Sequence, residues 1–460
     1  MNDRDFAEYS FWLDTAGEDL SPRPALPGDE SADVAVVGAG FTGLWTAYYL
    51  TKADPSLRVL VLEKEIAGFG ASGRNGGWCT ATFPASGDEV ARRYGPEAAL
   101  AMQGAMFQTV DEVGRVCEAE GIDAHYAKGG TLTVATTPPQ VGRLKQTLGR
   151  AHARGFSKDD CMWLDPSEAA ERIAVNDCLG ATYTPHCAAL HPARLARGLA
   201  RVVERLGVRI HERTTVTSIE KGRVRTDRGV VRAGVVVRAL EGYTDAVPGH
   251  RRLLLPLHIF MIATEPLPQA FWREVRWRGH ETLADASYSF LYAQRTADDR
   301  IAIGGRGARY HFGSAVPDPA GGDPSVTREL VEVLRTMFPA IGDVGITHRW
   351  GGYIGVPRDW FGSVGFDAGS GLAWGGGHVG DGVSVSNLAG RTLADLITGR
   401  ESELARLPWV GHAWRKWEPE PLRWIGVNLA TTLRIGGDRA ESRTGRPSRM
   451  ARIGGWLMGA

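Results

Sequence analysis

Two kinds of hydrophobic spacing alternate along this chain. Residues 33–37 (DVAVV), which are apolar from residue 34 on, and 59–62 (VLVL) are typical of strands buried on both faces of a parallel sheet. Residues 44–50 (LWTAYYL) connect them as a helix. Apolar residues that recur every three or four positions predict further helices at 89–120, 139–153 and 192–206. Strand, helix and strand in this order indicate a Rossmann-like layer.

A second region has the pattern of an antiparallel sheet. Residues 253–304 contain the strand-like stretches HIFMIAT, YSFLYA and RIAIGG, and short strands are also expected at 129–136 and 180–184. The chain returns to the first layer after residue 206 and again at 371–399, which has the order strand, glycine loop and helix. We expect an α/β fold with a Rossmann-like domain of the glutathione-reductase type and a second α+β domain built on an antiparallel sheet.

These returns predict a domain order along the chain. The first domain is expected at residues 32–90, 189–250 and 345–400, and the second at 91–188 and 251–344. Residues 401–460 form a tail rich in Trp and Arg, expected as surface helices. Residues 1–31 carry Tyr9, Phe11 and Trp12 and are expected to dock by these aromatic rings.

A G-x-G-x-x-G motif stands where the first strand turns into its helix. Gly38 permits the tight turn, Gly40 lets backbone amides approach a pyrophosphate, and Gly43 lets helix and strand pack closely. The start of the helix, Phe41 and Thr42, adds amide donors and partial positive charge. Glu63 follows the second strand, with Lys64 beside it, where a carboxylate can accept the ribose hydroxyls of a dinucleotide.

A second glycine-rich loop, residues 68–77 (GFGASGRNGG), follows this unit. Ser72, Arg74 and Asn75 offer side-chain donors, and Gly76 and Gly77 allow the backbone to lie against a flat ligand. Gly73 belongs to the same candidate cofactor site. The alternative is a flexible surface loop.

Composition narrows the class of protein. Apolar residues make up 43% of the 460 residues, and Lys+Arg and Asp+Glu both number 53, so nothing in the charge calls for nucleic acid. The N-terminus lacks the features of a secretory signal, and no apolar run is long enough to span a membrane. The five scattered cysteines indicate reduced thiols of a cytoplasmic protein, and no metal-ligand spacing is present.

Four separated segments resemble the D-amino-acid-oxidase-like family of FAD-dependent amine oxidoreductases, over about residues 32–400. Besides the first glycine motif, they are HPARLARGL at 191–199, GYT at 242–244 and the glycine segment after residue 371. Within this family, ASGRNGG at 71–77 and RWGG at 349–352 look most like the γ-glutamylputrescine oxidase branch.

The resemblance implies an FAD site and its residues. It implies that the adenosine half lies on residues 38–43 and Glu63, and that residues 72–77 run beside the pyrophosphate and the flavin. It also implies that Val216 meets the adenine, that Gly242 belongs to a second cofactor signature, and that a third segment meets the pyrimidine edge of the flavin. The residues of that segment are Gly380, Asp381, Gly382 and Val383.

Two departures from the family pattern change these expectations. Some members tether the flavin through a cysteine near the position of Gly351, and this chain has none there, so we expect noncovalent FAD. Those members also carry a lysine that binds the substrate carboxylate, where this chain has Ser384. A simple N-methyl amino acid is therefore in doubt as a substrate, whereas a larger or less acidic amine fits.

The activity implied by the resemblance is oxidation of a C–N bond to an imine, which water hydrolyses. Hydride passes to flavin N5, and O2 or another acceptor reoxidises the flavin. The candidate catalytic residues are Tyr288, His258 and His378, with Phe290 and Tyr292 as further walls of an aromatic pocket. Arg306 could receive a substrate carboxylate. In the alternative, the rings belong to an ordinary strand, the histidines to the core, and the arginine to the surface.

Two other functions compete with amine oxidation. A flavin monooxygenase would need a nicotinamide site, and the chain shows no second independent dinucleotide fingerprint. A flavin-bearing subunit could dock a partner or a membrane surface through its tail, where six arginines lie between residues 434 and 452. The sequence leaves the substrate, the electron acceptor and the oligomeric state open.

Overall fold

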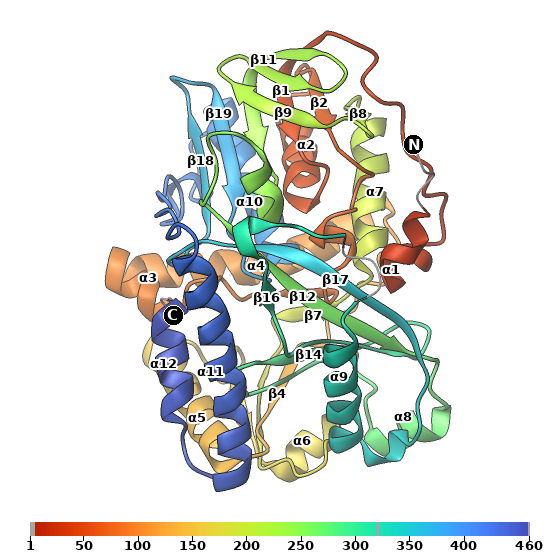
Figure 1. Cartoon of the computed structure of the whole chain (residues 1–460), viewed down its shortest axis with the longest axis vertical. Helices are drawn as coiled ribbons and strands as arrows, with labels where there is room; N and C mark the ends of the chain where they lie inside the picture. The colour runs from red at the N-terminus through yellow and green to blue at the C-terminus, as the bar shows by residue number, and fades with distance from the viewer. Residues whose placement is uncertain (1–4, 319–321, 459–460) are drawn as a thin grey trace.

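The computed structural model of the protein describes residues 5–318 and 322–458 and contains two large sheets (Figure 1). The first has the strand order β18-β19-β11-β1-β2-β8, with the β9–β10 hairpin joined to β11. Its central strand β1 (Glu30–Val37) runs parallel to β2 (Val59–Leu62) and β11 (Val230–Arg238). The remaining strands are β8 (Arg209–His211), β9 (Val216–Glu220), β10 (Arg223–Thr226), β18 (Ser363–Asp367) and β19 (Leu372–Gly376).

This sheet is the predicted Rossmann-like layer. Residues Val34 to Val37 of β1 are almost completely buried, because helices cover one face and the β9–β10 hairpin and the N-terminal segment cover the other. That double burial explains the unbroken apolar run. The predicted α/β fold with a Rossmann-like domain is confirmed.

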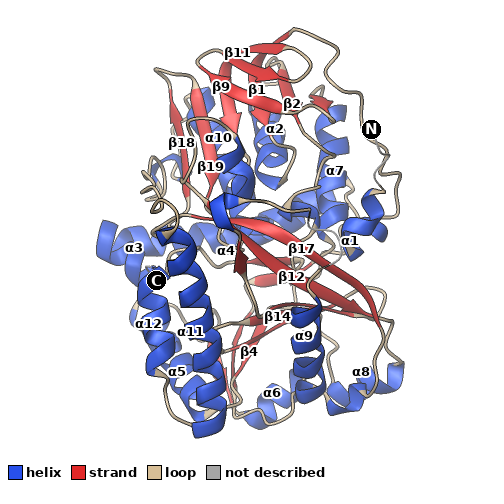
Figure 2. Ribbon diagram, in the orientation of Figure 1, coloured by secondary structure: helices blue, strands red, loops and turns tan. Residues whose placement is uncertain are grey.

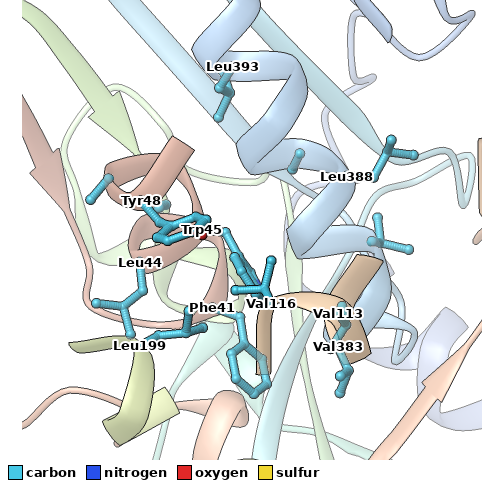
Figure 3. Close-up of a cluster of buried hydrophobic side chains, with 14 of the residues drawn as sticks. Phe41, Leu44, Trp45, Tyr48, Val113, Val116, Leu199, Val383, Leu388 and Leu393 are labelled. Atoms are coloured by element: carbon cyan, nitrogen blue, oxygen red, sulfur yellow. The ribbon is translucent and has the colours of Figure 1, made fainter. Parts of the chain in front are cut away.

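Four helices pack together beside the first sheet. They are α2 (Phe41–Ala53), α4 (Pro96–Glu120), α7 (Pro192–Arg205) and α10 (Gly382–Thr398). Figure 3 shows their side chains meeting, with Trp45 of α2, Val116 of α4 and Leu388 of α10 in one cluster. Helices α2 and α10 approach closely at Gly390, where a Cβ would lie 2.6 Å from the backbone of Trp45.

Helix α4 differs from the sequence prediction in two ways. The single helix expected at 89–120 is broken into α3 (Gly87–Tyr94) and α4, because Gly95 has φ +94° and Pro96 starts a new helix. In addition, α4 buries its apolar face against the helices of the first sheet. It therefore packs with the Rossmann-like layer, although the sequence assigned residues 91–188 to the second domain.

The second sheet has the strand order β16-β12-β15-β14-β13-β4-β6-β5, with β17 paired to β12. Its pairs are antiparallel except for β4 with β13. The strands are β4 (Thr131–Val134), β5 (Met162–Leu164), β6 (Ala181–Thr184), β12 (Leu255–Thr264), β13 (Thr282–Asp285), β14 (Leu291–Arg295), β15 (Ile301–Gly305), β16 (Arg309–Tyr310) and β17 (Ile346–Val356). The predicted antiparallel second domain is thus present.

Strand β17 corrects one predicted boundary. It pairs with β12 from Leu255–Val356 to Thr264–Ile346 and so belongs to the second sheet, whereas the sequence placed residues 345–400 in the first domain. The chain re-enters the first sheet only at β18. Because β17 carries Gly351 and Gly352, the glycine pair of the RWGG motif belongs to the second sheet.

The other helices surround the second sheet and its flanks (Figure 2). They are α5 (Pro138–Ala153), α6 (Pro166–Arg172), α8 (Gln269–Val275), α9 (Pro324–Met337), α11 (Leu422–Thr444) and α12 (Arg449–Met458). A small sheet of β3 (Trp78–Thr80) and β7 (Cys187–Ala189) completes the strands. None of the helices in residues 5–318 and 322–458 is long and apolar enough to cross a membrane.

The N-terminal segment docks by its aromatic rings, as predicted. Phe11 and Trp12 of α1 (Phe11–Asp14) are buried, together with Phe6 and Tyr9 of the preceding turn. Trp12 Nε1 donates to the carbonyl of Asn75 over 2.7 Å, and Ser10 Oγ donates to the carbonyl of Gly73 over 2.8 Å. The segment therefore holds the glycine-rich loop 68–77 in place.

Candidate flavin and substrate site

The first βα turn has the backbone geometry that the G-x-G-x-x-G motif predicts. Gly38 has φ +105°, and a Cβ there would lie 2.6 Å from the carbonyl oxygen of Ala239. A Cβ on Gly43 would overlap the carbonyl oxygen of Gly38. The turn and the close packing of α2 on β1 therefore both require glycine.

The N-terminus of α2 is open to an anion. Gly40 is the N-cap and has no side chain to accept the first amides. Phe41 donates its amide to Ser72 Oγ over 2.8 Å, whereas the amides of Thr42 and Gly43 have no acceptor within the described part of the chain. A phosphate is the ligand that such a helix start prefers.

Glu63 lies at the end of β2, beside this helix start. Its Oε2 accepts the amide of Ala39 over 2.9 Å, and its Oε1 accepts the amide of Glu65 over 3.0 Å. Burial raises the pKa of the Glu63 carboxyl to about 7. Each oxygen keeps a lone pair, so the carboxyl can still accept ribose hydroxyls.

Two other predicted cofactor residues lie near Glu63 along the chain or the sheet. Lys64 is exposed. Val216 is the first residue of β9, two residues after Thr214, and the amide of Thr214 donates to the Glu63 carbonyl over 2.9 Å.

The loop 68–77 is an ordered structure, in contrast to the flexible alternative. Asn75 Nδ2 donates to the carbonyls of Ala71 and Ser72, and its Oδ1 accepts the amide of Gly77 over 2.7 Å. Asn75 therefore folds the loop and is not a free donor to a ligand. A Cβ on Gly73 would collide with the carbonyl of Gly68.

Gly76 and Gly77 lie against side chains of the second sheet. A Cβ on Gly76 would lie 2.7 Å from the ring of Tyr292, and one on Gly77 would overlap the side chain of Gln294. Both glycines leave room for these protein side chains, and contact of their backbone with a flat ligand stays a prediction. Their absent side chains let β14 approach the loop.

Arg74 is a buried cation without an acidic partner. Only 2% of it is exposed, and its Nη2 donates to the hydroxyl of Tyr243 over 2.9 Å. Its other acceptors are the carbonyls of Gly70 and Gly351, at 3.3 Å and 3.5 Å. No carboxylate of the described residues forms an ion pair with it. A buried guanidinium in this state favours a bound anionic group.

The carboxylate of Glu241 binds three segments of the chain, a role that the sequence patterns did not predict. Its carboxylate accepts the amides of Gly377 over 2.9 Å, His378 over 3.0 Å and Gly355 over 3.3 Å. Glu241 has φ +43°, an uncommon conformation outside glycine, and it directly precedes the GYT motif. A Cβ on Gly242 would lie 3.0 Å from the carbonyl of Tyr353. The motif therefore joins β11, β17 and the start of α10.

The N-terminus of α10 forms a second open helix start. Gly380 is exposed, has φ +106°, and has no atom near the place of a Cβ. Asp381 is the N-cap without a side-chain bond, and burial raises its pKa to about 8. The amides of Gly382 and Val383 have no acceptor within the described part of the chain. This arrangement suits the electron-rich edge of a flavin.

Ser384 and His378 stabilise this helix start from inside. Ser384 Oγ donates to the carbonyl of Thr80 over 2.5 Å, so it is not free for a substrate. His378 is buried, its Nδ1 lies 3.3 Å from Ser386 Oγ, and its Nε2 has no partner. Burial lowers the pKa of His378. Ser386 Oγ also lies 3.1 Å from Thr42 Oγ1, which links the two open helix starts.

His258 lies beside Gly351 on the second sheet. Its ring stacks on Tyr353 at a centroid distance of 4.3 Å, and its Nδ1 lies 3.5 Å from His311 Nε2. A Cβ on Gly351 would overlap His258 Nε2, which is buried and has no partner. Burial, followed by the charges of His311 and Arg74, lowers the pKa of His258 to about 4, so the imidazole is neutral near pH 7.

Tyr288, Phe290 and Tyr292 do not form the expected common wall. Tyr288 donates its hydroxyl to Glu441 of α11 over 2.9 Å, and Phe290 is 56% exposed. Only Tyr292 faces the loop, at Gly76. The reason is that Tyr288 lies in the turn before β14 and faces α11, whereas the rings of Phe290 and Tyr292 lie next to each other at a centroid distance of 6.0 Å. Tyr288 therefore does not share a site with the other two rings.

The guanidinium of Arg306 already pairs with carboxylates of the protein, so it is not free to bind a substrate carboxylate. Its Nη2 forms an ion pair with Asp285 at 2.5 Å, and its Nη1 lies 3.6 Å from Asp438 of α11. Among the described residues, no three His, Cys, Asp or Glu side chains gather as metal ligands.

The donor set fits FAD. An open helix start and Glu63 would hold the adenosine diphosphate part, and buried Arg74 and the open α10 start would hold the flavin part. Gly351 has no side chain that could tether a flavin, so the bond to a cysteine seen in some members is excluded at this position.

Comparisons with known proteins identify the family of the chain. The family model described as "DAO: FAD dependent oxidoreductase" matches residues 33–396. The chain is 30% identical over 396 residues to the γ-glutamylputrescine oxidoreductase of Escherichia coli, covering 84% of this chain and 89% of that protein. It is 29% identical over 412 residues to the probable oxidoreductase OrdL of Haemophilus influenzae, covering 86% and 89%.

A solved structure shows the same fold. The glycine oxidase of Geobacillus kaustophilus superposes with a TM-score of 0.71 at 21% identity, covering 84% of this chain and all of that chain. The resemblance drawn from the sequence is thus confirmed, and with it the enzyme class and the cofactor FAD. The chain belongs to the DAO family of FAD-dependent oxidoreductases.

Proposed function

We propose that this enzyme oxidises the C–N bond of an amine or amino acid to an imine, which water then hydrolyses. The relatives support this reaction, because they include the γ-glutamylputrescine oxidoreductase of Escherichia coli and a sarcosine oxidase subunit beta of an Arthrobacter species. Both names describe nitrogen compounds. Bound FAD would supply the acceptor for hydride at its N5.

One observation carries the proposal: the surroundings of His258 disfavour a positive charge on nitrogen. Burial and the nearby His311 and Arg74 lower the pKa of His258 to about 4. The same burial and positive charge would lower the pKa of a substrate amine held there. Hydride can leave carbon only when the nitrogen lone pair is free. A substrate amine bound beside His258 would therefore be favoured in its reactive, neutral form.

The chain's own residues would bind and orient the substrate. The stacked rings of His258 and Tyr353 offer an apolar surface beside Gly351. Arg74 offers a cation 3.5 Å from the Gly351 carbonyl, measured from its Nη1. We propose that this cation binds an anionic group of the ligand, either a substrate carboxylate or the flavin. His378 positions the start of α10. Tyr288 is not part of the proposed substrate site, because its hydroxyl donates to Glu441.

We infer an electron acceptor, O2 or another molecule, from the family, and no contact in the described part of the chain identifies it. The partner is therefore a small amine or amino acid plus an acceptor. A cytoplasmic location remains a prediction from the sequence.

Anaerobic reduction of the flavin tests the proposal. The purified yellow protein is mixed, in the absence of air, with single members of a panel of amines and amino acids. Loss of the visible flavin absorbance with one chemical class, and recovery when air is admitted, would support C–N oxidation with O2 as acceptor. Loss of absorbance with NADPH but with no amine would overturn it in favour of a monooxygenase or reductase.

A further inference from the structure

We propose that the C-terminal hairpin of α11 and α12 is a docking surface for an anionic lipid membrane. It goes beyond the proposed reaction, because the residues involved lie outside the matched family segment 33–396. The surface consists of an apolar seam and an arginine set. The apolar seam comprises Leu422, Ile425, Leu429, Met450, Ile453 and Trp456, and the arginine set comprises Arg439, Arg443, Arg446, Arg449 and Arg452.

The apolar seam consists of large side chains exposed on both helices of the hairpin. Leu422, Ile425 and Leu429 recur at helical spacing on α11 and are 63%, 50% and 47% exposed. On α12, Met450, Ile453 and Trp456 recur every three residues, and Trp456 is 76% exposed. A globular protein rarely leaves so many large apolar side chains together in water unless they bind something.

Two glycine contacts bring the helices together at this face. A Cβ on Gly436 would lie 2.9 Å from Met450 Cε, and one on Gly454 would lie 3.3 Å from Leu433 Cβ. The buried side of the hairpin, with Val427, Ala430 and Met458, packs against the second sheet. The exposed seam residues are not part of this packed side, and the hairpin itself lies at the outer edge of the molecule (Figure 1).

The charge of the hairpin complements an anionic surface. All five members of the arginine set are exposed. The two acidic residues of the hairpin point inward: Glu441 is buried and binds Arg143, and Asp438 accepts the amides of Tyr288 and Ser289. No described residue from 422 to 458 is an exposed acid. An exposed apolar face with arginines and a tryptophan is the composition of a helix that lies in a membrane interface.

The charge also decides between a membrane and a second copy of the chain. A second copy would offer its own arginine set and no exposed carboxylate of the hairpin to pair with it. Anionic headgroups supply the missing negative charge, and the acyl region receives the apolar seam. Since no described helix can cross a membrane, the hairpin would bind in the plane of the interface.

Vesicle sedimentation of the full-length, FAD-loaded protein tests the proposal. The wild type is expected to sediment with vesicles of equal parts phosphatidylglycerol and phosphatidylcholine and to stay in solution with phosphatidylcholine alone. Ile453→Ser with Trp456→Ser, and separately Arg443→Glu with Arg446→Glu, should each weaken binding at least about tenfold. All four side chains are exposed, so the fold and the flavin absorbance should be unchanged.

Matched controls separate this surface from general effects of charge and hydrophobicity. Leu100→Ser with Leu179→Ser removes two exposed leucines, and Arg273→Glu with Arg328→Glu reverses two exposed arginines, all outside the hairpin. Both pairs should bind vesicles like the wild type. Wild-type protein that stays in solution with anionic vesicles, or hairpin variants that bind like the wild type, would overturn the proposal. A dimer that Ile453→Ser with Trp456→Ser converts to a monomer, without any vesicle binding, would show that a second copy covers the seam.

Discussion

The guanidinium of Arg74 donates a hydrogen bond to the hydroxyl of Tyr243 over 2.9 Å. The two residues come from different parts of the chain, the glycine-rich loop after β2 and the turn after β11. The bond joins them beneath β17, where Gly351 and Tyr353 lie. Because Tyr243 and the carbonyls around Arg74 are neutral, the positive charge of Arg74 is left for a ligand.

We expect Arg74→Gln to lower kcat/KM about 10- to 100-fold, because a charge-assisted hydrogen bond contributes about 1.5–3 kcal/mol. Tyr243→Phe is the matched control, since it removes the same hydrogen bond but keeps the charge. It should change kcat/KM only a few-fold. Steady-state kinetics with the best amine of the panel measures both. Equal losses in the two variants would show that Arg74 is a structural residue.

We expect Gly351→Ala to destabilise the protein by about 1–3 kcal/mol, because the new methyl group would overlap His258 Nε2 and overpack the site. Thermal unfolding measures the loss. In the background of His258→Ala, which removes the ring, the same substitution should cost little. A loss of equal size in both backgrounds would mean that the clash is elsewhere.

The unfolding free energy should depend on pH through His258. Its pKa is about 4 in the folded protein and about 6.5 when unfolded, so the unfolded state binds more protons between these values. The neutral ring contributes on the order of 3 kcal/mol to the unfolding free energy above pH 6.5, and this contribution is lost as the pH falls toward 4. Urea unfolding across this range should show a shallower pH dependence for His258→Gln than for the wild type. Parallel curves would contradict the assignment.

Glu241→Gln should weaken FAD retention and lower the unfolding free energy by about 1–3 kcal/mol. The substitution removes the charge that accepts the amides of Gly377, His378 and Gly355. Differential scanning calorimetry and the flavin-to-protein absorbance ratio measure the two effects. Glu220→Gln is the control, because that carboxylate pairs with arginines at the surface, where such pairs contribute at most about 1 kcal/mol. A similar loss of unfolding free energy in both variants would contradict a specific structural role of Glu241.

Local sequence patterns predicted the Rossmann-like layer correctly. The tight turn at Gly38 and the close packing at Gly43 depend on the backbone of a few neighbouring residues, and the burial of β1 depends on its own apolar run. The aromatic arm at Phe11 and Trp12 was equally visible, because rings of this size rarely stay in water.

Pairing between distant strands was harder to foresee. Strand β17 lies in the second sheet because its register with β12 buries both strands, and apolar spacing alone does not name a partner. Tyr288 seemed suited to a pocket, yet Glu441 from the C-terminal helix α11 takes its hydroxyl.

The cofactor fold can be predicted from the residues alone, because the glycine turn, the acid at Glu63 and the apolar strands act over short stretches of chain. The residues that share the candidate active site depend instead on how distant segments pack. Arg74 and Gly351 are 277 positions apart, and they meet because the two sheets pack so that loop 68–77 lies under β17. The turn that brings Tyr243 to Arg74 depends on the same packing. Contacts of this range are set by the burial of whole sheets, which no local pattern encodes.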